Sequence, residues 1–244
     1  AISLPDYNID AGFGGPVPLL SKKLGNLRFF ASFRSEHDAY LYQVSRPGLN
    51  KVSSLIKLTS DLSKSMKLSF SYIAGELQAT TLSRGGGASY MNDVWDLASQ
   101  VNMRGFTMPW RLFTDIYWSS STVNNATTAM KLTHQLSHRS FYEVLVKFDE
   151  KNYHTWHGAR RDTTRDNEIL DGYYVDDSPE GFWGSPYFSV DGRLAFGGAV
   201  STARDTSIIR SFTIKSDLTS QYNRTNQIKA GMEFVYNDLD LQFG

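Results

Sequence analysis

Residues 57–75 read KLTSDLSKSMKLSFSYIAG, and the second half of this stretch alternates strictly between apolar and polar side chains. In an extended chain, one face carries Leu68, Phe70 and Tyr72, and the other carries Lys67, Ser69 and Ser71. The polar residues around 61–65 predict a tight turn between two strands. We therefore expect a β-hairpin whose ring-bearing face is covered either by a second protein layer or by lipid.

The same plan of strand, polar turn and alternating strand occurs four times. Besides residues 54–72, it appears as TAMKLTHQLSHRSFYEVLVKF (128–148), SFTIKSDLTSQYNRTNQIKAGMEFVY (211–236) and, more divergent, YNIDAGFGGPVPLLSKKLGNLRFFASFR (7–34). The spacing of the copies is irregular, which favours a meander of hairpins over a solenoid.

The connections between the predicted strands alternate in length. Short turns are predicted around 61–65, 137–140 and 218–226, and long loops at 36–50, 76–126 and 150–206. Strands of about 9 to 11 residues cross a bilayer when tilted, and long loops on one side only are typical of outer-membrane barrels. The predicted fold is an all-β, antiparallel, up-and-down meander of about eight strands, a portion of a transmembrane outer-membrane β-barrel with long extracellular loops.

Composition narrows the function classes. Lys plus Arg and Asp plus Glu both number 25, so no net charge favours a nucleic-acid partner. There is no cysteine, which excludes disulfides and thiolate metal sites. No apolar run approaches the roughly 18 residues of a membrane helix. Both ends of the chain fall on the long-loop side, so we expect residues 1–244 to be a single, internal portion of a larger barrel.

Several segments together resemble a known family. FGGPVPLL, LGNLRFFASFRSE, LIKLTSDLSKSMKLS, KLTHQLSHRSFYEV and DLTSQYNRTNQIKAGMEFVYND are similar to early barrel strands of the TonB-dependent receptors, notably the subgroup with a carboxypeptidase-like regulatory domain. The resemblance implies a barrel of about 22 strands closed by a plug. It also implies uptake of a scarce substrate across the bacterial outer membrane, driven by the TonB complex. The sequence shows neither a plug nor a TonB box, so contact with TonB would run through a region missing here.

The long loops supply the candidate substrate-binding residues. Two histidines flank a tryptophan in residues 152–162, NYHTWHGARRD. Aromatic and acidic residues occur together in residues 171–188, DGYYVDDSPEGFWGSPYF, and two further segments around 84–118 contribute tryptophans. These rings could stack on a sugar or peptide, but the favoured interpretation is that most of them pack over the barrel rim. The candidates are Trp95, Trp110, Trp118, His154, Trp156, His157, Tyr173, Tyr174 and Trp183.

No catalytic, cofactor or metal residues are predicted, and we expect a non-enzymatic segment of a receptor or transporter. Its expected partners are outer-membrane lipid, the TonB complex and an unknown substrate. The alternative is a soluble, secreted all-β module that binds glycan or peptide. A remoter alternative, an all-β glycosidase, needs two convergent carboxylates, for which the sequence offers only the unselected set Asp149, Glu150, Asp176, Asp177 and Glu180.

Overall fold

The computed structural model describes residues 5–41, 45–81, 93–95, 98, 119–156, 168–171, 173–174, 189–190, 194–195 and 203–242. Eight long strands dominate: β1 (Tyr7–Pro16), β2 (Arg28–Ala39), β3 (Gly48–Asp61), β4 (Met66–Thr81), β5 (Ser119–Ser137), β6 (Ser140–Trp156), β11 (Ile208–Gln221) and β12 (Gln227–Asp240). The short elements are η1 (Lys22–Leu24), β7 (Glu168–Leu170), β8 (Tyr173–Tyr174), β9 (Ser189–Val190) and β10 (Leu194–Ala195). No helix in the described ranges is long and apolar enough to cross a membrane.

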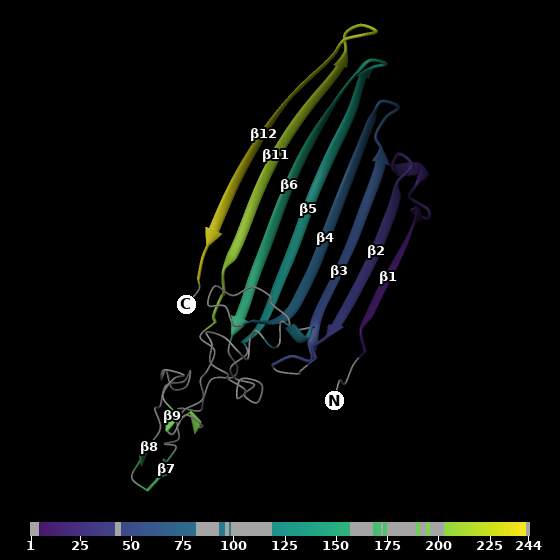
Figure 1. Cartoon of the computed structure of the whole chain (residues 1–244). Helices are drawn as coiled ribbons and strands as arrows, with labels where there is room; N and C mark the ends of the chain where they lie inside the picture. Colours follow the sequence, from purple (N-terminus) through teal and green to yellow (C-terminus); the bar gives the residue numbers. More distant parts are fainter. Residues whose placement is uncertain are drawn as a thin grey trace.

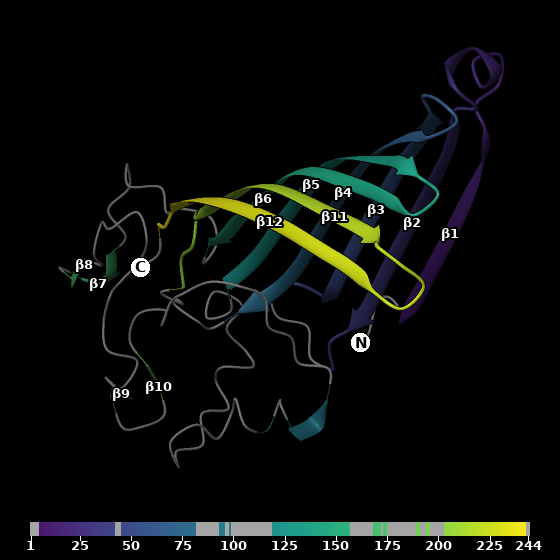
Figure 2. The same cartoon turned by 90° about the horizontal axis from the view of Figure 1, so that it is seen from above.

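The long strands form one antiparallel sheet in the order β1-β2-β3-β4-β5-β6-β11-β12 (Figure 1). Figure 2 shows this sheet as a curved, twisted wall with β1 and β12 at opposite edges. In the described part of the chain, each edge strand pairs on one side only, so the wall is open. The prediction of an all-β meander of about eight strands is confirmed.

The predicted loop bounds were wrong at the long-loop end, because the strands extend further into the sequence there. The eight strands have 10 to 19 residues, and the long connections shrink to 40–47, 82–118 and 157–207. The stretch SSSTVNNATT at the start of β5 reads as a polar loop, yet its Ser, Thr and Asn residues pair with β4 and β6. Backbone pairing on both sides holds such residues extended, whatever their individual preferences.

One face of the sheet is apolar across every long strand. A single row in register runs through Phe29, Leu58, Phe70, Met130, Val146, Ile214 and Phe234. The adjacent row on the other side runs through Phe30, Lys57, Ser71, Ala129, Lys147, Thr213 and Val235. We name these two sides the apolar face and the polar face. The alternation read from the sequence is confirmed.

No second layer covers the apolar face in the described residues. Ile56 is 48% exposed, Phe70 37%, Tyr72 40% and Phe234 58%. The only other sheets in the described residues are two small pairs, β7 with β8 and β9 with β10. A soluble sandwich would bury these side chains under a second sheet, and no such sheet is present in the part of the chain that the structure describes.

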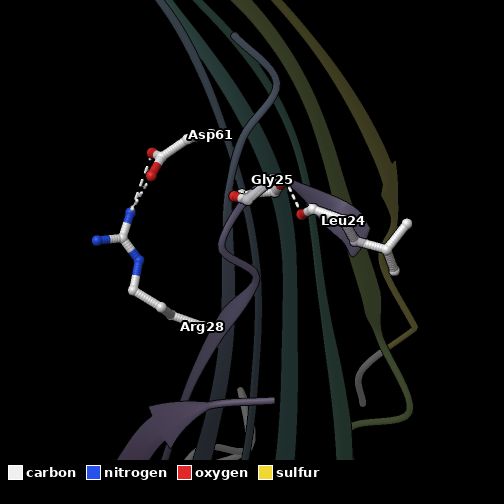
Figure 3. A network of polar contacts seen from close by, with 5 residues as sticks. Leu24, Gly25, Arg28 and Asp61 are labelled. Carbon is white, nitrogen blue, oxygen red and sulfur yellow. Dashed lines mark hydrogen bonds and ion pairs between the residues drawn. The ribbon is translucent and has the colours of Figure 1, made fainter. Parts of the chain in front are cut away.

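The short connections are fixed by local polar contacts. After η1, Gly25 has a φ of 61° in the left-handed region, and its carbonyl accepts a 2.6 Å hydrogen bond from the Asp61 backbone N–H. The Ser60 hydroxyl donates to the Leu24 carbonyl at 2.7 Å. One Arg28 nitrogen, Nη2, contacts both carboxylate oxygens of Asp61, at 3.0 and 3.1 Å (Figure 3). These contacts therefore attach the connection between β1 and β2 to the end of β3.

A small core lies at the opposite, long-loop end. Tyr40, Leu49 and Ala79 are buried, and Leu77 packs against them. The Thr80 backbone N–H donates to the Tyr40 hydroxyl at 3.1 Å. Burial raises the pKa of Tyr40, although this hydrogen bond opposes the shift.

Tyr40→Phe is expected to lower the free energy of unfolding by on the order of 1 kcal/mol, because one buried hydrogen bond is lost. Since the pKa of Tyr40 is higher in the folded chain, its stabilisation is complete below the unfolded tyrosine value of about 10 and declines as pH rises above it. Urea unfolding of the detergent-folded chain, at about pH 8 and about pH 11, should show a smaller alkaline loss in the variant. An equal loss in both proteins contradicts this role of Tyr40.

Candidate functional site

The polar face holds a cavity of about 670 Å³ near the long-loop end of the wall. Strands β4, β5, β6 and β11 form its floor, because their polar-face side chains converge there. Its polar-face lining residues are Leu77, Val123, Asn125, Thr127, Asp149, Lys151, Tyr153, Ile209 and Ser211. Glu150 also borders the cavity, although its register places it on the apolar face. Its volume lies within the range of about 300 to 1,000 Å³ that is typical of small-molecule sites.

Asp149 is held in this cavity by two polar partners. Lys147 Nζ lies 2.7 Å from its Oδ2, and the Thr127 hydroxyl donates to its Oδ1 at 2.8 Å. Lys151 Nζ lies 5.3 Å from the centre of the Tyr153 ring. The cavity therefore combines an oriented carboxylate, an ammonium and a phenol beside the apolar side chains of Leu77 and Val123. Such a mixture can bind a small polar molecule with an apolar part.

A buried polar cluster fixes the far rim of the cavity. The Ser121 and Thr155 hydroxyls are 2.9 Å apart, and both residues are buried. Thr155 forms an isolated bridge with Asp205, whose carboxylate accepts from the Ser207 backbone N–H at 2.9 Å. These contacts tie the start of β11 to the end of β6, which holds Tyr153 in place.

On the apolar face, a charged network replaces the rings just beyond Phe148. Arg210 Nε donates to Glu150 Oε2 at 2.9 Å, and its Nη1 lies 3.7 Å from Asp238 Oδ2. The hydrogen bond from Arg210 holds the pKa of Glu150 below its usual value. The apolar face therefore ends here, where aromatic side chains such as Phe148 are followed by charged side chains such as Glu150.

The predicted site residues fall into three groups. His154 and Trp156 lie on β6 in the alternation of the apolar face, away from the cavity, and Trp156 lies under the Arg204 guanidinium at 5.2 Å. Trp95 is 85% exposed, and Tyr173 and Tyr174 form β8. The other predicted site residues lie outside the described residues: Trp110, Trp118, His157 and Trp183.

Lys151 and Tyr153 were not predicted as site residues from the sequence, and Asp149 was predicted only as one of an unselected set of carboxylates. The strand that carries them was assumed to end near residue 149. Had the alternation of residues 142–148 been continued to Trp156, it would have placed Asp149, Lys151 and Tyr153 on the polar face together. Among the described residues, no group of three or more His, Asp or Glu side chains could hold a metal ion.

Two solved structures are similar in shape to this chain. The ferric-catecholate import receptor Fiu from E. coli K12, in its closed form, has a TM-score of 0.47 and 12% identity, covering 95% of this chain and 31% of Fiu. The copper transporter OprC has a TM-score of 0.33 and 10% identity, covering 97% of this chain and 37% of OprC. The chain thus spans about a third of each. No protein-family model and no curated protein matches it. Likeness at this level establishes no shared activity.

Proposed function

We propose that this chain forms part of the wall of an outer-membrane β-barrel that transports a small substrate. The apolar face contacts lipid, the polar face lines an aqueous or plugged interior, and the cavity beside Asp149 contacts the substrate on its way inward. The remaining wall comes from strands that pair with β1 and β12. The chain performs no chemical step on its substrate.

The exposed apolar face carries this proposal. Rings and aliphatic side chains occur on this face of all eight strands, and Ile56, Phe70, Tyr72 and Phe234 are 37% to 58% exposed. An apolar surface of that extent is unstable in water. A bilayer covers it without a second protein layer, while every inner strand keeps its backbone paired on both sides.

The slope of the apolar face is a second, independent support. The pairing from strand to strand shows which residues stand side by side across the sheet. At the long-loop edge of the apolar face, this pairing connects Tyr7 of β1 to Gln78 of β4. Tyr236 on β12 is level with Tyr72 of the same strand. Gln78 and Tyr72 are six residues apart, so the edge shifts by six residues over the seven steps from β1 to β12.

The short-turn edge shifts in the same direction. Phe13 is level with Tyr72, whereas Ala230 is level with Met66. Tyr72 and Met66 are six residues apart. The last apolar residue of β12 toward this edge is Ile228, two residues beyond Ala230, so the short-turn edge shifts by eight residues in total. Both edges therefore move by about one residue per strand.

A shift of one residue per strand is expected when the strands are tilted relative to the membrane normal and the apolar band stays parallel to the membrane plane. A rise of about 3.3 Å for each spacing of about 4.8 Å gives a tilt of roughly 35°, which matches outer-membrane barrels. On β12, the apolar face from Ile228 to Tyr236 runs about 26 Å along the strand. At that tilt it is about 22 Å tall, close to the apolar band of about 25 Å that surrounds such barrels.

The finer parts of the proposal follow the sequence resemblance. We place the chain in a TonB-dependent receptor of the subgroup with a carboxypeptidase-like regulatory domain, with the TonB complex acting through a plug outside this segment. The long connections face the cell exterior. Within the proposal, the predicted residues outside β6 capture substrate before it reaches the cavity: Trp95, Trp110, Trp118, His157, Tyr173, Tyr174 and Trp183.

Two isoleucines of the cysteine-free chain test the proposal directly. Ile56 lies on the apolar face of β3 and Ile73 on the polar face of β4, and their exposed fractions are 48% and 38%. Each is replaced by cysteine, labelled with a fluorophore, and the chain is folded into vesicles. Brominated acyl chains should quench the label at position 56, and aqueous iodide the label at 73, because only position 56 faces hydrocarbon.

The soluble binding module predicts a different pattern. In that case both labels are quenched by iodide and neither by brominated lipid, and the chain stays monodisperse without detergent. That outcome rejects the proposed membrane wall.

A further inference from the structure

The four short connections share one composition. They span residues 17–27, 62–65, 138–139 and 222–226, and Figure 1 shows them together at one end of the wall. In each connection, or within two residues of it, is a large exposed apolar side chain: Leu19 (95% exposed), Leu62 (55%), Leu136 (57%) and Tyr222 (74%). Leu62 and Tyr222 directly follow β3 and β11 and continue the alternation of the apolar face.

Each connection also carries exposed cations. These are Lys22 and Lys23, Lys64, Arg139 and Arg224, and no ion pair joins any of them to a carboxylate in the described residues. The nearby acids are already neutralised. Asp61 pairs with Arg28 at 3.0 Å, Glu143 with Lys131 at 2.8 Å and Asp217 with Lys215 at 3.8 Å. This end therefore presents uncompensated positive charge beside exposed apolar side chains.

The opposite limit of the apolar face carries charges of both signs. Glu150 and Asp238 pair with Arg210 there, and Arg46 donates to Gln78 and Thr122 on the same face. The exposed cations without an ion pair are therefore a feature of the short connections.

We propose that the short-connection end is a binding surface for anionic phospholipid headgroups. The inference rests on the proposed membrane wall. Leu19, Leu62, Leu136 and Tyr222 enter the boundary between headgroups and acyl chains, and the cations contact lipid phosphates. Basic side chains beside apolar side chains bind anionic lipids at membrane surfaces in this way.

Charge complementarity and position together select lipid as the occupant. The cations recur on four separate connections at one level of the wall, and each stands beside an apolar side chain. A row of that kind, directly continuous with the apolar face, matches a plane of negative headgroups. The five cations with no ion pair in the described residues supply the attraction, which weakens with salt because they are exposed.

Boundary-lipid selectivity tests the inference. The full chain is folded into phosphatidylcholine vesicles that contain spin-labelled phosphatidylglycerol or spin-labelled phosphatidylcholine, and the motionally restricted lipid is measured. We expect the wild-type chain to associate several-fold more strongly with phosphatidylglycerol. The variant Lys64→Gln, Arg139→Gln, Arg224→Gln should lose most of this preference, since each cation near the surface contributes up to about fivefold.

A matched control removes the same charge from the other face. Lys57→Gln, Lys67→Gln, Lys229→Gln changes three lysines of the polar face and should keep the wild-type preference. The proposed headgroup surface is rejected if both triple variants prefer phosphatidylglycerol equally, or if the wild-type chain shows no preference. In either case, a protein partner is the remaining candidate for this surface. Absence of any motionally restricted lipid rejects the membrane wall itself, so the two failures are distinguishable.

Discussion

Phe70→Lys is expected to lower the free energy of unfolding of the bilayer-inserted chain by roughly 2 to 4 kcal/mol. Phe70 lies in the middle of the apolar face, in register with Leu58 and Met130, so the new ammonium would enter hydrocarbon. The lysine cannot reach water without crossing several rows of apolar side chains. The effect should shrink toward either limit of the apolar face, because there the side chain reaches the headgroups.

Ile73→Lys is the matched control. Ile73 lies on the same strand and is 38% exposed, against 37% for Phe70, but it points from the polar face and stands opposite Leu55 and Thr127. We expect a cost below about 1 kcal/mol, as for an ordinary surface substitution. Urea unfolding of both variants in vesicles measures the difference. Equal costs would mean that the two faces meet the same solvent, which is incompatible with a membrane wall.

Gly25→Ala is expected to destabilise the chain by at least about 2 kcal/mol. Gly25 has a φ of 61°, which costs an L-residue roughly 1 to 2 kcal/mol. A Cβ at this position would also lie 2.0 Å from the Asp61 carbonyl oxygen, so the backbone must move. That movement breaks the hydrogen bond from Asp61 N–H to the Gly25 carbonyl and displaces the Arg28 ion pair.

Gly15→Ala tests whether the effect is specific. A Cβ added to Gly15 would meet no atom within 4 Å, and its backbone needs no left-handed conformation, since Gly25 has the only positive φ among the described glycines. We expect a change within about 0.5 kcal/mol. The measurement is the urea midpoint of the detergent-folded chain. A Gly25 variant as stable as the Gly15 variant would show that the contacts of Gly25 with the end of β3 do not stabilise the fold.

The sequence was sufficient to predict the two faces of the wall. A strand has a period of two, so Phe70 and Tyr72 had to lie opposite Ser69 and Ser71 wherever the strand ended. The positions of the short turns followed from the same alternation, because it stops at Leu62 and at Tyr222. Pairing order followed from short connections, which join neighbouring antiparallel strands.

The strand ends and the cavity could not be predicted in the same way. Residues 119–125 and 150–156 lie beyond the apolar face, where both sides of a strand are polar and the alternation no longer shows. The cavity needs Leu77, Tyr153 and Ile209, which are far apart in sequence and meet only through the register of four strands. His154 and Trp156 were grouped with His157 by proximity in sequence, although the pleat places them away from the cavity.

The open edges of the sheet decide how such a wall has to be built. Along β1 and β12, half of the main-chain donors and acceptors lack a ladder partner, and each such group costs several kcal/mol in hydrocarbon. A single copy of the chain would therefore leave two costly edges in the lipid. During insertion these edges must pair with adjoining strands, and when the chain is folded on its own in vesicles or detergent they will pair with other copies of the chain.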